Sequence, residues 1–237
     1  MSARPAAVQI ESVSDHRHRY FIAALRLYNR VFPAEEKIDR AYFRDMLEEK
    51  RLGLLFPFNL HFLVARRGER VVGLATGTYL AVVNVGFVGY LAVGRRAAGA
   101  RIGTRLRRRL VEELRRDARA TGRRDLDAVM GEVERDNPWL RHLIRHRRVF
   151  ALDLDYRQPP LRAQAQDVPL VLYVEPMGRS FRSLHADQVR ALLYAIYRRL
   201  YRIRFPLRVP SFTYMLRQLD GRRSLGRLRL DQLSPSG

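Results

Sequence analysis

The segment from Tyr90 to Thr104 combines an apolar stretch, three glycines and the start of a helical pattern. The apolar stretch that ends at Val93 is typical of a strand, and apolar residues recur at helical spacing from Ile102 onward. The first amides of a helix have no partner within the helix, and the helix dipole is positive at that end. Because such a junction binds phosphate or pyrophosphate, we interpret the segment as a cradle for a nucleotide-type cofactor.

The types of the other side chains exclude several kinds of reaction and metal site. The chain has no cysteine, which excludes disulfides, zinc–thiolate sites and thiol nucleophiles. His142 and His146 stand at helical spacing and could bind a metal or a phosphate, but four arginines flank them within residues 141–148. Nearby cations disfavour a bound metal, so we predict a solvated basic face and no metal cofactor.

The formal charge of +21 comes almost entirely from arginine, since Lys37 and Lys50 are the only lysines. A positive charge of this size favours binding to the phosphate backbone of nucleic acid. Arginines dispersed among acidic residues equally fit a genome whose base composition favours arginine codons, and we favour that interpretation. Tyr194, Tyr197 and Tyr201 could stack on bases, but their helical spacing favours packing in a core. Nucleic acid is therefore an open alternative and not the favoured partner.

Residues 1–15 lack the basic and then apolar layout of a signal peptide, and no apolar run approaches the about 20 residues of a membrane span. We therefore expect a cytoplasmic protein without a membrane partner. The 237 residues suffice for one large domain or for a domain with an appendage.

Apolar periodicity predicts the elements that position the cradle. Strands are expected at residues 7–13, 62–66, 71–79, 85–93, 126–133, 151–156 and 168–174. Helices are expected from Asp15 to Pro33, from Asp39 to near Gly53, from 102 to Gly122, from Asn137 to Ile144, from Asp187 to Tyr201, and over 214–219. The composition changes after Pro176, which predicts a domain over 1–176 and a helical C-terminal extension over 177–237 with a frayed basic tail from Ser224.

The order of these elements, with the cradle between the strand at 85–93 and its helix, resembles the GNAT superfamily of acyl-CoA-dependent N-acyltransferases over residues 7–176. The family's loop reads Arg or Gln, two residues, Gly, one residue, then Gly or Ala. Gly103 matches this pattern, whereas Ala98 and Arg101 replace the usual Arg or Gln and the first Gly. Asn137 also falls where the family has an asparagine. The resemblance implies an α+β fold with a mixed, mostly antiparallel sheet flanked by helices.

The resemblance also implies the co-substrate, acetyl-CoA or another acyl-CoA, whose thioester an amine attacks directly in a ternary complex. The main chain of Leu91 and Val93 would hold the pantetheine arm, and the amides from Gly99 to Thr104 would hold the pyrophosphate. We expect a loop geometry without positive φ at Arg101, because that conformation disfavours residues other than glycine. The implied cofactor-binding residues are Leu91, Val93, Gly99, Ala100, Arg101, Ile102, Gly103, Thr104 and Asn137.

Direct transfer also requires a base that removes the proton of the ammonium. The family's glutamate on the strand before the loop is replaced by Gly89. Glu132 and Glu134 lie on the strand that faces the acyl arm in the family and could replace it. Glu132 is our first choice for the base, and Glu134 is the weaker alternative. Charges at a strand end are equally consistent with a solvated edge. The family's tyrosine acid falls on Arg145, so the acid is missing or different, and Tyr156 is a poor substitute.

Two alternatives to an active N-acetyltransferase stay open. The departures at Gly89, Ala98, Arg101 and Arg145 are compatible with a catalytically degenerate GNAT-fold protein that binds coenzyme A or a protein partner. An arginine-rich nucleic-acid binder is the second alternative. The sequence identifies neither the class of the amine acceptor nor the length of the acyl chain. The extension is compatible with a cap over the domain, a cover for the acceptor site, or a homodimer contact.

Overall fold

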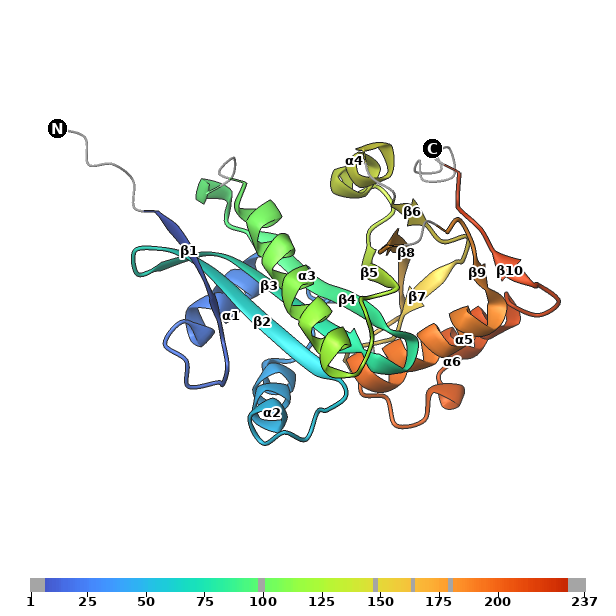
Figure 1. Cartoon of the computed structure of the whole chain (residues 1–237), viewed down its shortest axis with the longest axis horizontal. Coiled ribbons are helices and arrows are strands. Elements are labelled where there is room, and N and C mark those ends of the chain that lie inside the picture. Colours follow the sequence, from blue (N-terminus) through green and yellow to red (C-terminus); the bar gives the residue numbers. More distant parts are fainter. Residues whose placement is uncertain (1–6, 98–100, 147–148, 163–164, 179–180, 230–237) are drawn as a thin grey trace. The chain divides into compact units, whose positions relative to one another are not determined.

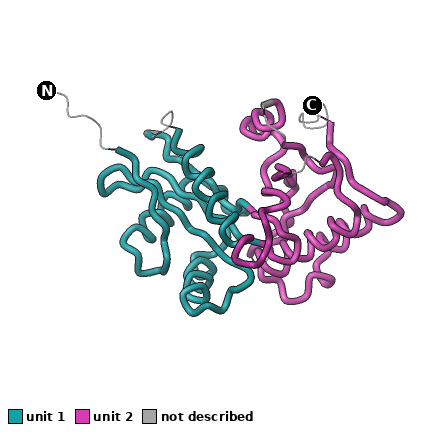
Figure 2. Tube along the Cα trace, in the orientation of Figure 1, with its two compact units in different colours: residues 1–79, 88–117 teal, residues 80–87, 118–237 magenta. Residues whose placement is uncertain are grey.

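We describe a computed structural model of the chain for residues 7–97, 101–146, 149–162, 165–178 and 181–229. The chain forms two compact units, residues 1–79 with 88–117, and residues 80–87 with 118–237 (Figure 2). Within the described residues, none of the helices has the length and apolar character that a bilayer crossing demands.

The first unit is built on four neighbouring strands, in the order β1-β2-β3-β4 (Figure 1). β1 pairs with β2 and β2 with β3, both antiparallel, and the hairpin between the latter two turns at Gly68 with φ of 58°. The strands span Val8–Ser12 (β1), Asn59–Arg67 (β2), Arg70–Leu80 (β3) and Val85–Val93 (β4). A short 3-10 turn, η1 (Ala81–Val83), joins the last two.

Helices α1 (Phe21–Val31) and α2 (Arg40–Arg51) bury their apolar faces in one core with alternate residues of β2. That core contains Leu60, Phe62 and Val64 of the strand. α2 begins as predicted, because the carboxylate of Asp39 accepts a hydrogen bond from the amide of Ala41 at 2.7 Å.

The predicted start of the first helix at Asp15 is wrong. The Asp15 carboxylate accepts from the amide of Arg17 at 2.6 Å, and its carbonyl accepts from the amide of His18 at 3.3 Å. These bonds form a local turn, and α1 begins only at Phe21 after Tyr20. Asp15 therefore closes a turn instead of capping the helix.

Helix α3 (Ile102–Ala120) contacts β2 and β3 through residues that alternate with those of the first core. His61 Nε2 lies 2.6 Å from Asp117 Oδ2, and Asn59 Nδ2 donates to Asp117 Oδ1 at 2.7 Å. A Cβ at Gly73 would lie 2.9 Å from Leu106 Cδ1. The absence of a side chain at position 73 therefore favours this close approach of the helix to β3.

The second unit contains β5 (Ala128–Val133), β6 (Phe150–Ala151), β7 (Tyr156–Gln158) and β8 (Val168–Pro176). β8 pairs antiparallel with the other three. The single strand predicted over 151–156 is wrong: the segment forms two short strands. Between them the amide of Asp153 donates to the carbonyl of Gly226 at 3.0 Å, and that of Asp155 donates to Gln218 Oε1 at 2.8 Å. The extension thus takes hydrogen bonds that a continuous strand would give to its neighbour.

Helix α4 (Pro138–His146) begins at the predicted Asn137, whose side-chain oxygen accepts from the amide of Trp139 at 3.0 Å. Its residues Leu140 and Leu143 pack in a core with Tyr173 of β8. Contacts group residues 118–176 with the C-terminal extension in the second unit. The domain boundary at residue 176 stays a prediction.

The extension is mainly helical, as its pattern predicts, but it differs in detail. The helix expected from Asp187 to Tyr201 is α-helical only to Ala195 and continues as a π-helical turn. His185 and Gln188 form a capping box at its start. The expected helix at 214–219 begins earlier, at Pro210. The elements are β9 (Leu184–His185), α5 (Ala186–Ala195), η3 (Ile196–Leu200), η4 (Pro206–Arg208), α6 (Pro210–Arg217) and β10 (Ser224–Leu225).

The predicted fraying from Ser224 is wrong for residues 224–229. β10 pairs antiparallel with β9, and the amide of Leu228 donates to the carbonyl of Ala151 at 2.9 Å. Arg222 also donates to the Asp153 carboxylate at 2.6 Å. Backbone pairing over a polar sequence, which side-chain periodicity does not report, fixes this segment. The rest of the predicted tail lies outside the described residues.

The contact of α3 with β2 yields a prediction about stability. We expect Asp117→Ala to lower the free energy of unfolding by about 2–3 kcal/mol, because it leaves the buried polar groups of Asn59 and His61 without an acceptor. Urea unfolding monitored by circular dichroism measures the change. Asp45→Ala is the control, since Asp45 forms only an exposed pair with Arg44 and should change stability by less than about 0.5 kcal/mol. Equal stability of the two variants would contradict the prediction.

Candidate functional site

The end of β4 and the start of α3 form the predicted strand, loop and helix junction. The amide of Gly94 donates to the carbonyl of Val72 at 2.9 Å, and a 3-10 turn, η2 (Arg95–Ala97), follows. In α3 the first bond of the helical ladder runs from the amide of Arg105 to the carbonyl of Arg101 at 3.0 Å. The amides of residues 102–104 precede it, and these are the donors that an α-helix leaves for an anion.

The helix start is held against the strand that precedes it. In the part of the chain that the structure describes, a Cβ at Gly103 would meet only Val93 Cγ2, at 3.6 Å, so Gly103 lies beside the end of β4. The guanidinium of Arg105 donates to the carbonyl of Val8 on β1 at 2.9 Å. The predicted cofactor residues Gly99 and Ala100, together with Ala98, lie outside the described residues.

Arg101 has a positive φ of 51°, so the expectation of a loop without this conformation is wrong. The family pattern has glycine at this position, and glycine is the residue that adopts the left-handed region without cost. The backbone therefore takes the conformation suited to the family's glycine although the residue is arginine. This strains the loop by an amount on the order of 1 kcal/mol.

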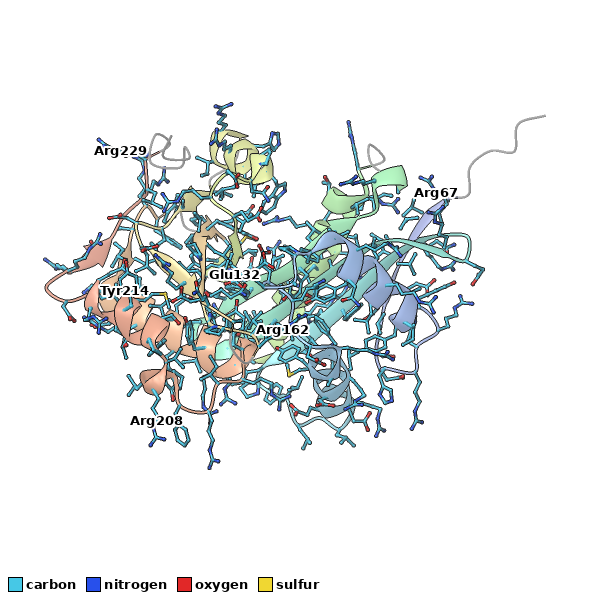
Figure 3. The ribbon with its side chains drawn as sticks, turned by 180° about the vertical axis from the view of Figure 1, so that it is seen from behind. Arg67, Glu132, Arg162, Arg208, Tyr214 and Arg229 are labelled. Atoms are coloured by element: carbon cyan, nitrogen blue, oxygen red, sulfur yellow. The ribbon has the colours of Figure 1, made fainter. Side chains whose placement is uncertain are left out.

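Glu132 on β5 is a partly buried carboxyl (Figure 3). Its Oε1 accepts a hydrogen bond from the hydroxyl of Tyr201, and its Oε2 is buried and makes no hydrogen bond within the described part of the chain. Burial raises the pKa of Glu132 to about 7, although the hydroxyls of Tyr201 and Tyr156 act to lower it. This carboxyl can therefore exchange a proton near neutral pH.

Two further tyrosines surround this carboxyl as neutral groups. Burial and the charge of Glu132 raise the pKa of Tyr156 well above its ordinary value. Burial also raises the pKa of Tyr197, whose hydroxyl lies 2.6 Å from the carbonyl of Arg157 and 3.1 Å from Ser211 Oγ. Both hydroxyls therefore remain protonated at neutral pH.

Sequence reasoning selected Glu132 but missed Tyr201 as its partner. Tyr197 is buried in the core, as its spacing predicts, and Tyr201 both packs against Tyr197 and bonds to the carboxyl. The same prediction is wrong for Tyr194, which is exposed on α5. Glu132 and Tyr201 are 69 positions apart. No local signal connects them, so only the fold brings the two together.

The structure also gives the positions of other residues that the sequence analysis assigned to the site, but it does not test their roles. Glu134 is exposed beyond the end of β5, and the side chain of Asn137 caps α4. A Cβ at Gly89 would lie 3.2 Å from Thr76 Oγ1, which already accepts from the amide of Tyr90 at 3.0 Å. Among the described residues, no group of three or more metal-ligating side chains is found. The binding and catalytic roles assigned from the sequence stay predictions.

A family model described as the acetyltransferase (GNAT) family matches residues 13–146, more than half of the chain. The chain belongs to the GNAT acetyltransferase family. The predicted resemblance is therefore confirmed, and the match contains both the helix junction and Glu132. It ends before the C-terminal extension. A search of curated proteins finds no match to this sequence.

Solved structures share the GNAT fold with this chain at low sequence identity. A GNAT-family protein of Bacteroides thetaiotaomicron aligns with a TM-score of 0.60 and 18% identity, covering 83% of this chain and 99% of the other. The ribosomal-protein-alanine N-acetyltransferase of Brucella melitensis aligns with a TM-score of 0.50 and 19% identity, covering 71% of this chain and 99% of the other. A Salmonella typhimurium protein solved with its cofactor acetyl-CoA aligns with a TM-score of 0.50 and 17% identity, covering 73% of this chain and 96% of the other. The expected α+β fold, a mixed, mostly antiparallel sheet flanked by helices, is confirmed.

The left-handed conformation of Arg101 leads to a prediction for the GNAT loop. Arg101→Gly should raise the free energy of unfolding by about 0.5–1 kcal/mol, because glycine relieves the strain at positive φ. Arg108→Gly, in the exposed interior of α3, is the matched control and should lower it by about 1 kcal/mol. Urea unfolding compares the two. Destabilisation of the same size in both variants would show that position 101 has no such strain.

Proposed function

We propose that this GNAT-family protein is an acyl-CoA-dependent N-acyltransferase with Glu132 as its general base. The observation that carries the proposal is the carboxyl itself, which has one oxygen held by Tyr201 and the other without a hydrogen bond in the described chain. A base is most effective when its pKa lies near the working pH, and burial raises the pKa of Glu132 to about 7. Family membership supports acyl transfer to an amine.

In the proposed reaction, Oε2 of Glu132 takes a proton from the acceptor ammonium. The lone pair of the neutral amine then forms a bond to the carbonyl carbon of the thioester. The carbon–sulfur bond breaks, and sulfur leaves with the electron pair. The nitrogen then passes its extra proton to the thiolate, which gives the amide and the free thiol. A free thiol has a pKa of about 8.5, so the thiolate leaves without a strong acid, which the absence of a tyrosine at Arg145 requires. The protein mainly supplies orientation and the base.

The start of α3 is the proposed site for the pyrophosphate of acyl-CoA. Its donor set fits the group, because the amides of residues 102–104 stand at the positive end of a long helix. The main chain of Leu91 and Val93 is proposed to hold the pantetheine arm. When bound, acyl-CoA supplies an activated acyl group. The Salmonella structure solved with acetyl-CoA supports this choice of co-substrate.

We propose that the acceptor is an amine and do not assign it to a narrower class. The formal charge of +21 favours an acceptor with acidic groups. The cytoplasmic location, the homodimer contact and the absence of a metal stay predictions. The degenerate alternative differs from our proposal in one respect, since it binds acyl-CoA but releases no thiol.

The first test is turnover by Glu132→Gln. With acetyl-CoA and a panel of amines, we expect wild-type protein to release free thiol, and the variant to lose at least about 100-fold in kcat/KM because it lacks the base. The wild-type rate should rise with pH through an apparent pKa of about 7. Glu134→Gln is the control, since Glu134 is exposed, and it should keep its activity.

Two results would count against the proposal in different ways. Full turnover by Glu132→Gln would remove Glu132 from the mechanism. A silent panel together with thermal stabilisation of the protein by acetyl-CoA would favour the degenerate alternative.

The second test uses the pH dependence of stability. The pKa of Glu132 rises from its ordinary value of 4.5 to about 7 on folding, so the folded protein holds a proton that the unfolded chain releases. The resulting stabilisation is complete below pH 4.5 and is lost as pH rises through 7. Glu132→Gln lacks this loss and should be more stable than wild type by about 3–3.5 kcal/mol at pH 9, with little such gain at pH 4. Urea unfolding at both pH values measures it. Curves that stay parallel for the two proteins would contradict the raised pKa.

A further inference from the structure

We infer that Tyr201, which the C-terminal extension supplies, is a positioning residue that holds the Glu132 carboxylate for proton transfer. The extension would then be part of the site, although the GNAT family match ends at residue 146. The inference rests on the proposed function, because it assigns Tyr201 a task in that reaction.

The backbone around Tyr201 is arranged in an uncommon way. After α5 the chain makes a π-helical turn, and the amide of Tyr201 donates to the carbonyl of Ile196, five residues earlier, at 3.0 Å. Arg202 then has a positive φ of 56°, and the amide of Ile203 donates back to the carbonyl of Tyr197 at 2.9 Å. Single π turns and strained residues persist where their surroundings enforce them, often at functional sites. Here they set the direction of Tyr201.

The ring of Tyr201 is supported by Tyr197. Their ring centroids are 6.0 Å apart and the planes cross at 75°, an edge-on contact. Tyr197 is itself held by the carbonyl of Arg157 and by Ser211. The Tyr201 hydroxyl is thereby directed at Oε1 of Glu132, and its hydrogen bond leaves Oε2 for the substrate proton.

Neutral groups surround the Glu132 carboxyl in the described chain. Tyr156 approaches it from β7, and Tyr197 and Tyr201 approach it from the extension. On β8 its partner in the ladder is Leu172, which is apolar. No lysine, arginine or histidine contributes to its pKa, and the bond from Tyr201 is the largest influence that favours the charged form. Loss of that hydroxyl should therefore leave the carboxylate less stable relative to the acid.

The direct experiment measures the pKa of Glu132 by carbon NMR on protein with 13C-labelled glutamate side chains, with Glu132→Gln identifying the resonance. We expect Tyr201→Phe to raise this pKa by about one pH unit, the effect of losing one hydrogen bond to a charged group. Tyr194→Phe is the matched control: Tyr194 is exposed on α5, and the pKa should not move. A pKa that is unchanged in Tyr201→Phe overturns the inference.

Two additional proteins separate positioning from a general loosening of the core. Replacement of Tyr201 by 3-fluorotyrosine keeps the hydroxyl and makes it a stronger donor, so the pKa of Glu132 should fall. Tyr197→Phe loses the bonds to Arg157 and Ser211 and should destabilise the protein with less effect on that pKa. Equal pKa shifts in Tyr197→Phe and Tyr201→Phe overturn the inference.

Kinetics then connect the contact to the reaction. At pH 7 we expect Tyr201→Phe to lose about five- to sixfold in kcat/KM and to recover toward wild type at pH 9, where Glu132 ionises again. Glu132→Gln should not recover. A loss in Tyr201→Phe that is as large at pH 9 as at pH 7 overturns the claim that Tyr201 acts through the ionisation of Glu132. If wild type transfers no acyl group to any amine, the proposed function fails, while the NMR titration still decides whether Tyr201 controls the carboxyl.

Discussion

The close approach of α3 to β3 is the constraint on which the first unit depends. Leu106 and Ile102 lie over Gly73, where a Cβ would be 2.9 Å from Leu106 Cδ1 and 3.3 Å from Ile102 Cγ2. Farther along the helix, Asp117 is tied to His61 and Asn59 of β2. A helix fixed at two places on a sheet cannot slide or tilt, so its first amides stay beside the end of β4. The proposed anion site would therefore follow from how the helix packs and would need no dedicated side chain.

The second unit contains Glu132, a carboxyl whose burial disfavours its charged form. A carboxyl that ionises at about pH 7 costs stability at neutral pH, because its charge is poorly solvated. The tyrosines around it reduce this cost without removing it. The fold tolerates the group through the ladder between β5 and β8 and through the packing of the extension on the segment from Asp153 to Arg157. Such a trade between stability and reactivity is expected of a catalytic base.

Local patterns predicted the parts of this fold that local forces determine. The strands around the cradle, the Asp39 cap and the α3 stripe each follow from neighbouring residues. Glu132 could be selected as a carboxylate on the correct strand, but its partner could not, because Tyr201 is 69 positions away. The break between β6 and β7 and the pairing of β10 likewise depend on backbone bonds between distant segments. Periodicity carries no information about such bonds.

The clearest failures of local rules fall beside the proposed site residues. Within the described residues, Asn84, Arg101 and Arg202 are the non-glycine residues with positive φ. Asn84 is an ordinary case, because asparagine tolerates this conformation. Its side-chain Nδ2 also donates to the carbonyl of Asp125 at 2.9 Å. Arginine, unlike asparagine, is not a residue type that favours this conformation. Of the two arginines, one begins the helix that would bind pyrophosphate, and the other follows the tyrosine that contacts Glu132. Strain at both places is consistent with a backbone shaped by the site and paid for by the surrounding packing.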